Sequence, residues 1–147
     1  MQRKICTFAG HREIYDTDSI KVKLKNEIIN LVKNHGVTTF YNGGMGKFDW
    51  LCAKCVKELK SDYPFIKSYL ILAYKNESGT NRYEDFDDMI YPNLEPVLSK
   101  YAIIKQNEWM IDRADFLITY VHNEWSGAYR TLTYAKKKSD IKICHIF

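Results

Sequence analysis

Apolar residues follow two different patterns along this chain. Short, nearly continuous apolar runs are typical of strands that are covered on both faces. Such runs occupy residues 4–9, 37–41, 66–74, 115–121 and 141–147. Between them, apolar residues return every three to four positions, which predicts helices. The predicted helices lie at residues 20–35, 48–60, 94–100 and 102–113, and a last helix begins within residues 122–129 and is completed by residues 131–138.

The order of these segments predicts the fold class. Strands alternate with helices through short links, which favours an α/β fold with a parallel sheet and right-handed crossovers. We expect at least five strands, with the strand at residues 4–9 in the centre of the sheet. The 147 residues show no repeat and no internal boundary, so we expect a single domain over residues 1–147.

Composition and charge narrow the function only slightly. The net charge is +4, from 22 basic and 18 acidic residues, which is too mild to favour nucleic acid as the main partner. No apolar run reaches membrane-spanning length, and the N-terminal residues do not resemble a secretory signal. We therefore expect a cytoplasmic protein without a membrane partner.

The four cysteines are expected to be reduced thiols in that compartment. Cys52 and Cys55 form a C-x-x-C pair, which permits a redox or zinc interpretation. Both lie on the apolar face of the helix predicted at residues 48–60, and no second close pair supplies further zinc ligands. We interpret them as buried apolar thiols and expect no metal site.

The stretch from Thr39 to Asp49 carries the strongest local signal. A predicted strand ends in three glycines within four residues, Gly43, Gly44 and Gly46, and a helix then begins. Glycines let the backbone approach a ligand, and a helix start offers unpaired N–H groups to an anion. A purely structural turn is the equal alternative, since the spacing matches neither the dinucleotide fingerprint nor a P-loop. Asp49 is expected to cap the helix or to bind a sugar hydroxyl.

Two other segments carry chemistry. Gly10, His11 and Arg12 follow the first predicted strand, at the end where α/β sheets bind ligands, and Arg12 suits phosphate or carboxylate. A solvated loop is the equal alternative there. Residues 84–88 contain four carboxylates, which permit metal binding or acid–base chemistry. We favour a solvated loop or a first helical turn for them.

Four motifs, in this order, resemble the SLOG superfamily and most closely its YpsA-like branch. They are FAGHR at residues 8–12, FYNGGMGKFD at 40–49, NEWMID at 107–112, and GA at 127–128 followed by YAK at 134–136. The resemblance covers nearly the whole chain and implies a Rossmann-like three-layer fold that binds nucleotides or nucleotide-derived molecules. Some relatives are phosphoribohydrolases that release a base, some sense signalling nucleotides in anti-phage defence, and one handles single-stranded DNA.

This sequence departs from the family pattern at three positions. Gln106 stands where the branch usually has arginine, and Ser126 where it usually has glycine. Alignment with the hydrolase relatives places Thr131 at the position of their catalytic glutamate. Glycoside hydrolysis needs a carboxylate beside the anomeric carbon. Asp49 is therefore the candidate catalytic residue, with Glu124 as a more mobile second.

The first hypothesis is a homo-oligomeric protein that binds a nucleotide-like signal without a cofactor, sensing or sequestering it as in anti-phage defence or counter-defence. The N–H groups of residues 43–47 and 126–128 would face phosphates, Arg12 would clamp one, and Trp125 or Tyr129 would stack on a base. The alternative is a nucleoside 5′-monophosphate N-glycosidase. A third hypothesis is a protein- or DNA-interaction module with a vestigial pocket. The expected ligand-binding residues are Gly10, His11, Arg12, Asn42, Gly43, Gly44, Met45, Gly46, Asp49, Asn107, Trp125, Ser126, Gly127 and Ala128.

Overall fold

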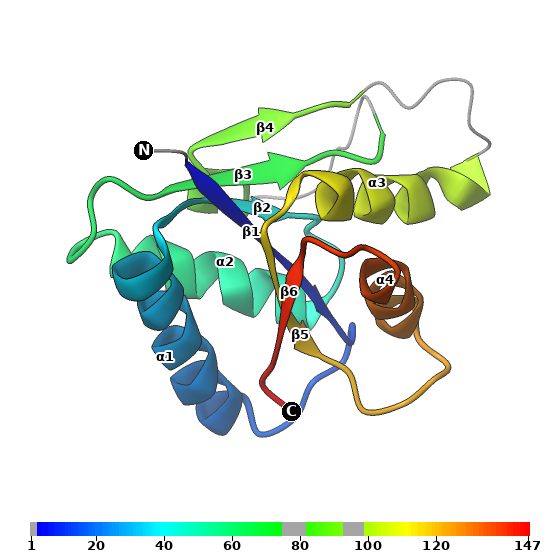
Figure 1. Cartoon of the computed structure of the whole chain (residues 1–147), viewed down its shortest axis with the longest axis horizontal. Helices are drawn as coiled ribbons and strands as arrows, with labels where there is room; N and C mark the ends of the chain where they lie inside the picture. The colour runs from blue at the N-terminus through cyan, green and yellow to red at the C-terminus, as the bar shows by residue number, and fades with distance from the viewer. Residues whose placement is uncertain (1–2, 75–81, 93–98) are drawn as a thin grey trace.

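The computed structural model describes residues 3–74, 82–92 and 99–147, which form one six-stranded parallel sheet (Figure 1). Across the sheet the strand order is β4-β3-β2-β1-β5-β6. The first strand lies inside the sheet as predicted, because β1 pairs with β2 on one side and with β5 on the other. The strands are β1 (Lys4–Gly10), β2 (Val37–Asn42), β3 (Lys67–Ile71), β4 (Asp88–Ile90), β5 (Phe116–Tyr120) and β6 (Lys142–His145).

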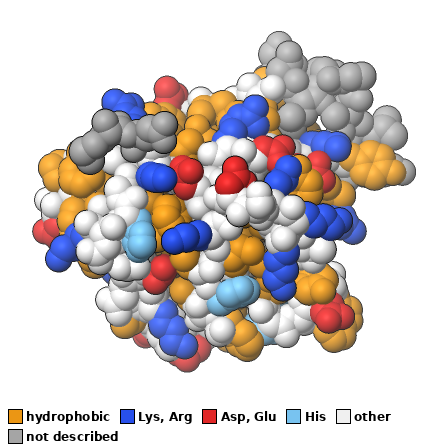
Figure 2. All heavy atoms as spheres, viewed as in Figure 1, with side chains coloured by type: hydrophobic (Ala, Val, Ile, Leu, Met, Phe, Trp, Pro, Cys, Tyr) orange, Lys and Arg blue, Asp and Glu red, His pale blue; other side chains and the backbone are white. Residues whose placement is uncertain are grey.

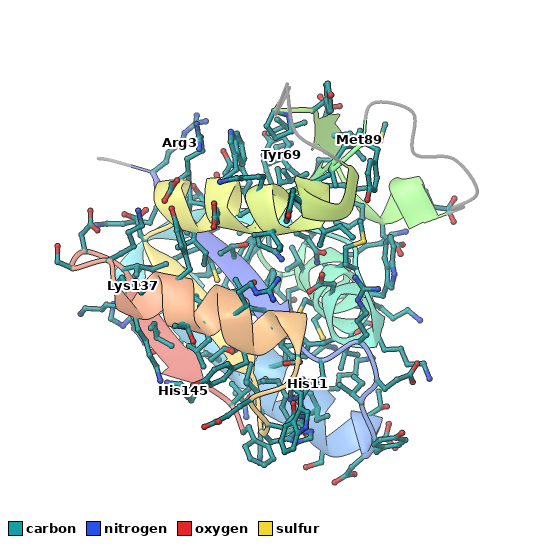
Figure 3. All side chains as sticks on the ribbon, turned by 90° about the vertical axis from the view of Figure 1, so that its right-hand side faces the viewer. Arg3, His11, Tyr69, Met89, Lys137 and His145 are labelled. Carbon is teal, nitrogen blue, oxygen red and sulfur yellow. The ribbon has the colours of Figure 1, made fainter. Side chains whose placement is uncertain are left out.

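Helices cover both faces of this sheet, which confirms the predicted α/β, Rossmann-like three-layer fold. On one face lie α1 (Thr17–His35) and α2 (Lys47–Leu59), and on the other α3 (Ser99–Arg113) and α4 (Gly127–Lys136). In Figure 3, which is turned by 90° from Figure 1, α3 and α4 lie side by side. No described helix is long and apolar enough to cross a membrane.

The first helix shows how the apolar pattern becomes packing. Ile20, Leu24, Ile28 and Leu31 recur at helical spacing and are all buried. The helix ends where Gly36 takes a φ of 73° and donates its N–H to the carbonyl of Leu31. That left-handed conformation favours glycine and is a common way to end a helix.

The larger core lies between the sheet and the pair α1 and α2. Phe8 of β1 and Phe40 of β2 stack there with ring centroids 6.0 Å apart. Cys52 and Cys55 of α2 belong to the same core as free thiols without exposed surface, which confirms their predicted burial. The smaller core, on the opposite face, contains Ala9, Ile111, Leu117, Leu132 and Ala135.

The β4 edge of the sheet confirms one part of the prediction for residues 84–88 and corrects another. Glu84 and Asp85 lie in a helical turn as predicted, because a 3₁₀-helix spans Arg82–Asp85, but Asp88 begins a strand. This strand has three residues, two of them exposed, so it has no apolar alternation that the sequence could reveal. Pairing with β3 creates it, and the Asp87 carboxylate adds a hydrogen bond from the N–H of Ser68 at 2.8 Å.

Three element boundaries also differ from the apolar pattern. The helix predicted at residues 102–113 starts at Ser99, and the predicted helix at 94–100 lies largely outside the described residues. The last helix starts at Gly127, inside the predicted loop and helix start at residues 122–129, because Ser126 caps it, but it ends at Lys136 rather than Lys138. The third strand ends at Ile71, three residues before its predicted end.

Candidate functional site

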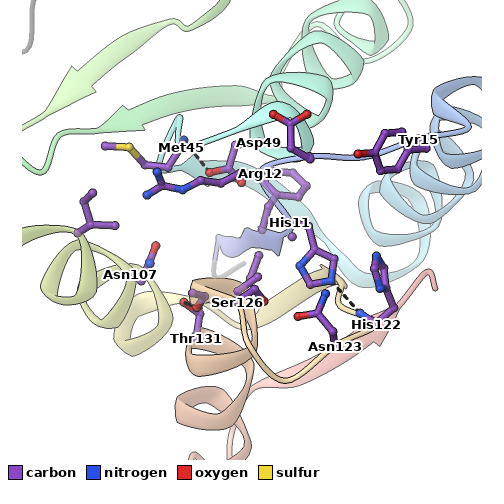
Figure 4. A pocket seen from close by; sticks show the side chains of 17 residues that line it. His11, Arg12, Tyr15, Met45, Asp49, Asn107, His122, Asn123, Ser126 and Thr131 are labelled. Atoms are coloured by element: carbon purple, nitrogen blue, oxygen red, sulfur yellow. Dashed lines mark hydrogen bonds between the residues drawn. The ribbon is translucent and has the colours of Figure 1, made fainter.

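A cavity of about 430 Å³ lies at the carboxyl edge of the sheet (Figure 4). The chain leaves β1 toward α1 on one face and leaves β5 toward α4 on the other face. Where neighbouring strands send their loops to opposite faces, an open α/β sheet forms its ligand crevice. The volume lies within the range of about 300–1,000 Å³ that small-molecule sites occupy.

The start of α4 presents unpaired backbone donors to this cavity. The Ser126 hydroxyl accepts a hydrogen bond from the N–H of Tyr129 at 3.1 Å. This cap leaves the N–H groups of Gly127 and Ala128, which border the cavity, without an acceptor among the described residues. A helix start carries about half a positive charge. The two free donors therefore favour an anion.

Neither the backbone conformation nor the packing at Gly127 requires a glycine. Its φ lies outside the left-handed region, and a Cβ placed on it would meet no atom of the described chain within 4 Å. Gly10 differs, since a Cβ there would lie 2.2 Å from the Phe48 ring. The space beside Gly127 belongs to the cavity, so glycine at this position leaves room for a ligand against the helix start.

Arg12 supplies a full positive charge at the same cavity. Figure 4 shows its exposed side chain extending beside Met45 and Asp49, with Asn107 on the other side of the cavity. No carboxylate in the described part of the chain forms an ion pair with its guanidinium. Because a guanidinium offers five N–H donors in a fixed fork, Arg12 suits a phosphate.

Asp49 is a buried carboxyl in the first turn of α2 that also borders the cavity. Its Oδ2 accepts a hydrogen bond from the N–H of Met45 at 2.9 Å. Burial raises the pKa of Asp49 to about 7, although this hydrogen bond and the charge of Arg12 act in the opposite direction. Near neutral pH the carboxyl can therefore accept a hydrogen bond from a sugar hydroxyl or donate a proton.

His11 is a neutral donor at the far side of the cavity. Its Nε2 accepts a hydrogen bond from the backbone N–H of His122 at 2.9 Å, so the ring proton must lie on Nδ1. Burial, and then the neighbouring His122 ring at 4.2 Å between centroids, lower the pKa of His11. The neutral ring thus adds a hydrogen-bond donor to the cavity rather than a second cation.

The glycine turn before α2 uses most of its backbone donors within the protein. Gly44, Met45 and Lys47 all donate their N–H groups to acceptors within the protein, which corrects the expectation that these donors face phosphates. Gly46 has a φ of 111°, and a Cβ on it would lie 2.5 Å from the Arg12 Cα. The glycines therefore let the turn pack against the loop that carries Arg12.

The structure brings nine of the fourteen expected ligand-binding residues to the cavity. They are Gly10, His11, Arg12, Met45, Asp49, Asn107, Ser126, Gly127 and Ala128. Asn42, at the end of β2, and Gly43, Gly44 and Gly46, in the turn after it, do not line the cavity. Trp125 is 87% exposed and borders a different hollow together with Tyr129, so neither expected stacking residue reaches the cavity.

Sequence reasoning missed several residues that line the cavity. Asn123 follows His122 directly after β5, so the strand-end rule that indicated Arg12 would also have indicated this pair. Ile103 on α3 lines the cavity as well, but an apolar helix residue gives no such signal. The other residues that were missed are Phe8, Ala9, Glu13, Tyr15 and Thr131.

Gln106, the residue that replaces the family's arginine, is fully buried beside this site. Its Nε2 donates to the carbonyl oxygens of Gly43 and Ile71 at 3.1 and 2.6 Å, and its Oε1 has no partner among the described residues. It therefore joins α3 to the ends of β2 and β3. Among the described residues, no group of three or more His, Cys, Asp or Glu side chains could hold a metal ion.

Comparisons with known proteins agree with the fold. A model of the YspA SLOG family, YpsA, matches residues 4–146. No curated protein sequence gave a match. DNA processing protein A from Helicobacter pylori, solved for its single-stranded DNA binding mode, is similar with a TM-score of 0.66 and 15% identity. Its counterpart from Streptococcus pneumoniae (DprA) has a TM-score of 0.65 and 10% identity.

The two solved structures are longer than this chain. The alignments cover 95% and 97% of this chain but only 64% and 50% of the two structures. At such low identity the likeness concerns the fold, which is Rossmann-like in both cases.

Proposed function

This chain belongs to the YspA SLOG family, and from that premise we propose that its cavity binds a nucleotide or a nucleotide-derived small molecule. The observation that carries the proposal is the convergence of Arg12 with the two free N–H groups of Gly127 and Ala128 at one cavity. A guanidinium and a helix start both recognise phosphate. Asp49, which lies beside Arg12 in Figure 4, suits a sugar hydroxyl.

We also propose that the protein senses or sequesters a signalling nucleotide, that it does so in the cytoplasm, and that it is a homo-oligomer. The support for binding without catalysis is chemical. The Asp49 carboxyl is held by a hydrogen bond from the N–H of Met45. The Thr131 hydroxyl donates a hydrogen bond to the Gly127 carbonyl at 3.2 Å. The position of the hydrolase glutamate is thus filled by a hydroxyl side chain that bonds to the helix backbone and carries no carboxylate.

The N-glycosidase remains the second candidate, because Asp49 titrates near neutral pH inside the cavity. Hydrolysis would break the bond between the base and the anomeric carbon, with water adding its hydroxyl to the sugar and a proton passing to the base. A carboxyl with a pKa near 7 can supply such a proton. Chromatography of AMP incubated with the protein tests this, since free adenine must appear and must disappear with Asp49→Asn.

Single-stranded DNA is a further ligand to test, because it is what the Helicobacter pylori protein binds. On the face shown in Figure 2, Lys and Arg side chains are interspersed with acidic and apolar ones. Such a mixed face gives weak support to an extended phosphate backbone. A short oligonucleotide therefore belongs in the same panel as the nucleotides.

Calorimetric titration with mono-, di- and cyclic nucleotides tests the main proposal. Arg12→Ala should weaken binding by about 1.5–3 kcal/mol, the typical value of a hydrogen bond to a charged group. Arg3→Ala is the matched control, since Arg3 is exposed at the start of β1, far from the cavity in Figure 3. Tight nucleotide binding that both variants retain would place the site elsewhere. Tighter binding of the oligonucleotide than of any nucleotide would favour the DNA alternative.

A further inference from the structure

A second, smaller hollow lies between α3 and α4, and some of the residues that line it also line the ligand cavity. Its volume is about 220 Å³. Five residues border both spaces: Arg12, Ile103, Asn107, Gly127 and Thr131. Four more line the smaller space but not the ligand cavity: Ile104, Glu108, Arg130 and Tyr134. We call this smaller space the helix groove; Figure 3 shows the two helices that form it.

The walls of the helix groove suit a planar, partly polar ring. Ile103 and Ile104 are half-buried apolar side chains on α3. The Tyr134 ring on α4 is held in place by a hydrogen bond from its hydroxyl to Asp112 at 2.8 Å. The Asn107 amide has no hydrogen-bond partner in the part of the chain that the structure describes. Apolar walls with one free amide match the faces and the polar edge of a nucleobase.

The ligand cavity has apolar as well as polar walls, and its polar groups, Arg12, Asp49 and the start of α4, are those that suit a phosphate and a sugar. Of its Phe and Tyr residues, Phe8 is buried in the core and Tyr15 is 79% exposed. The two aromatic residues expected to stack on a base, Trp125 and Tyr129, border another hollow. A base attached to a phosphate at the start of α4 therefore finds its apolar surface in the helix groove.

We propose that the helix groove holds the nucleobase of a ligand whose phosphate lies at Arg12 and Gly127. This inference rests on the proposed nucleotide binding. The groove is smaller than the roughly 300 Å³ at which separate small-molecule sites begin, so it suits one part of a ligand that continues into the cavity. Gly127 borders both spaces and, without a side chain, leaves the passage between them open.

Calorimetry with the four ribonucleoside 5′-monophosphates and with ribose 5-phosphate tests the inference. Wild type should bind at least one monophosphate more tightly than ribose 5-phosphate. Ile104→Trp, which fills only the helix groove, should lower the affinity for that monophosphate by at least about tenfold. It should leave the affinity for ribose 5-phosphate within about twofold. Lys136→Trp, at an exposed position of α4 that lines neither space, should change neither affinity.

The outcomes separate this inference from the proposed function. Wild type that binds neither probe class contradicts nucleotide binding itself. Equal affinity for monophosphates and ribose 5-phosphate, or an equal loss of both in Ile104→Trp, contradicts only the position of the base. If Ile104→Trp does not fold, Ile104→Ala should raise the affinity for the bulkier etheno-AMP relative to AMP. An unchanged ratio in that variant would also overturn the inference.

Discussion

The backbone N–H of Met45 donates a hydrogen bond to the Asp49 carboxyl at 2.9 Å, so a carboxyl of the ligand cavity also closes the glycine turn. That turn packs against the loop of Arg12, whose backbone lies 2.5 Å from where a Cβ on Gly46 would be. The charge state of Asp49 and the placement of Arg12 therefore depend on one small piece of structure.

The first prediction concerns the pH dependence of stability. The pKa of Asp49 is about 7 in the folded protein and about 3.9 when unfolded. The folded state thus holds a proton that unfolding releases, so the free energy of unfolding should fall as pH rises from about 4 to 7. The slope from this group reaches at most about 1.4 kcal/mol per pH unit. Above pH 7 its contribution should be constant.

Asp49→Asn should remove this dependence, because the amide oxygen still accepts from Met45 but does not titrate. The measurement is urea unfolding at several pH values, and the difference between the two proteins should grow in favour of the variant as pH rises. Parallel curves for the two proteins between pH 4 and 7 would show that Asp49 is ionised at ordinary acidic pH.

A second prediction concerns His11 and has the opposite sign. Its pKa is lowered below the ordinary value by burial and by His122, so the folded state binds fewer protons than the unfolded one. Stability from this group should be complete above pH 6.5 and should be lost as pH falls through the lowered pKa. His11→Gln keeps an acceptor for the His122 N–H and should remove this acid loss. His11→Ala should cost about 1–3 kcal/mol at all pH values, since that N–H loses its partner.

Most of the fold follows from the sequence because burial controls the apolar pattern of its main elements. Phe8 and Phe40 sit in runs that only a covered strand explains, and the spacing of Leu24 and Ile28 is that of a packed helix. The strand β4 could not be predicted, since its three residues gain their conformation from hydrogen bonds to β3.

The site was predictable where it depends on strand ends and not where it depends on side-chain direction. Arg12 and Gly127 follow strands that meet at one edge, so topology alone brings them together. Trp125 follows the same strand as Gly127, but the loop conformation leaves it 87% exposed. The sequence also does not reveal that the N–H of Gly44 is used within the protein. It donates a hydrogen bond to the Asn42 side chain at 2.8 Å, which only the folded turn shows.

A third prediction separates backbone strain from packing at two glycines. Gly46→Ala should destabilise the protein by more than the roughly 1–3 kcal/mol of a strained backbone, since its Cβ would also clash with the Arg12 backbone. Gly36→Ala is the control, because Gly36 has a φ of 73° but its nearest atom to a new Cβ is the Lys4 Cγ at 4.0 Å. Thermal unfolding should show the larger loss for Gly46→Ala. Equal losses would mean that the turn does not press on Arg12.

The last prediction is that Gly127→Ala raises stability and lowers ligand affinity. Gly127 begins α4 with no left-handed φ, so alanine should fit the backbone and restrict the unfolded chain, adding about 0.4–1 kcal/mol. A Cβ there meets no described atom within 4 Å, so no clash offsets the gain.

The same methyl group would enter the space where a phosphate meets the helix start. Nucleotide affinity should then fall by about 1–3 kcal/mol, the usual cost of overpacking. Thermal unfolding and calorimetry on one preparation measure both effects, with Ala128→Gly as the reverse change at the next residue, expected to destabilise without filling the cavity. A variant that gains stability and binds nucleotides as tightly as wild type would show that no ligand occupies the space beside Gly127.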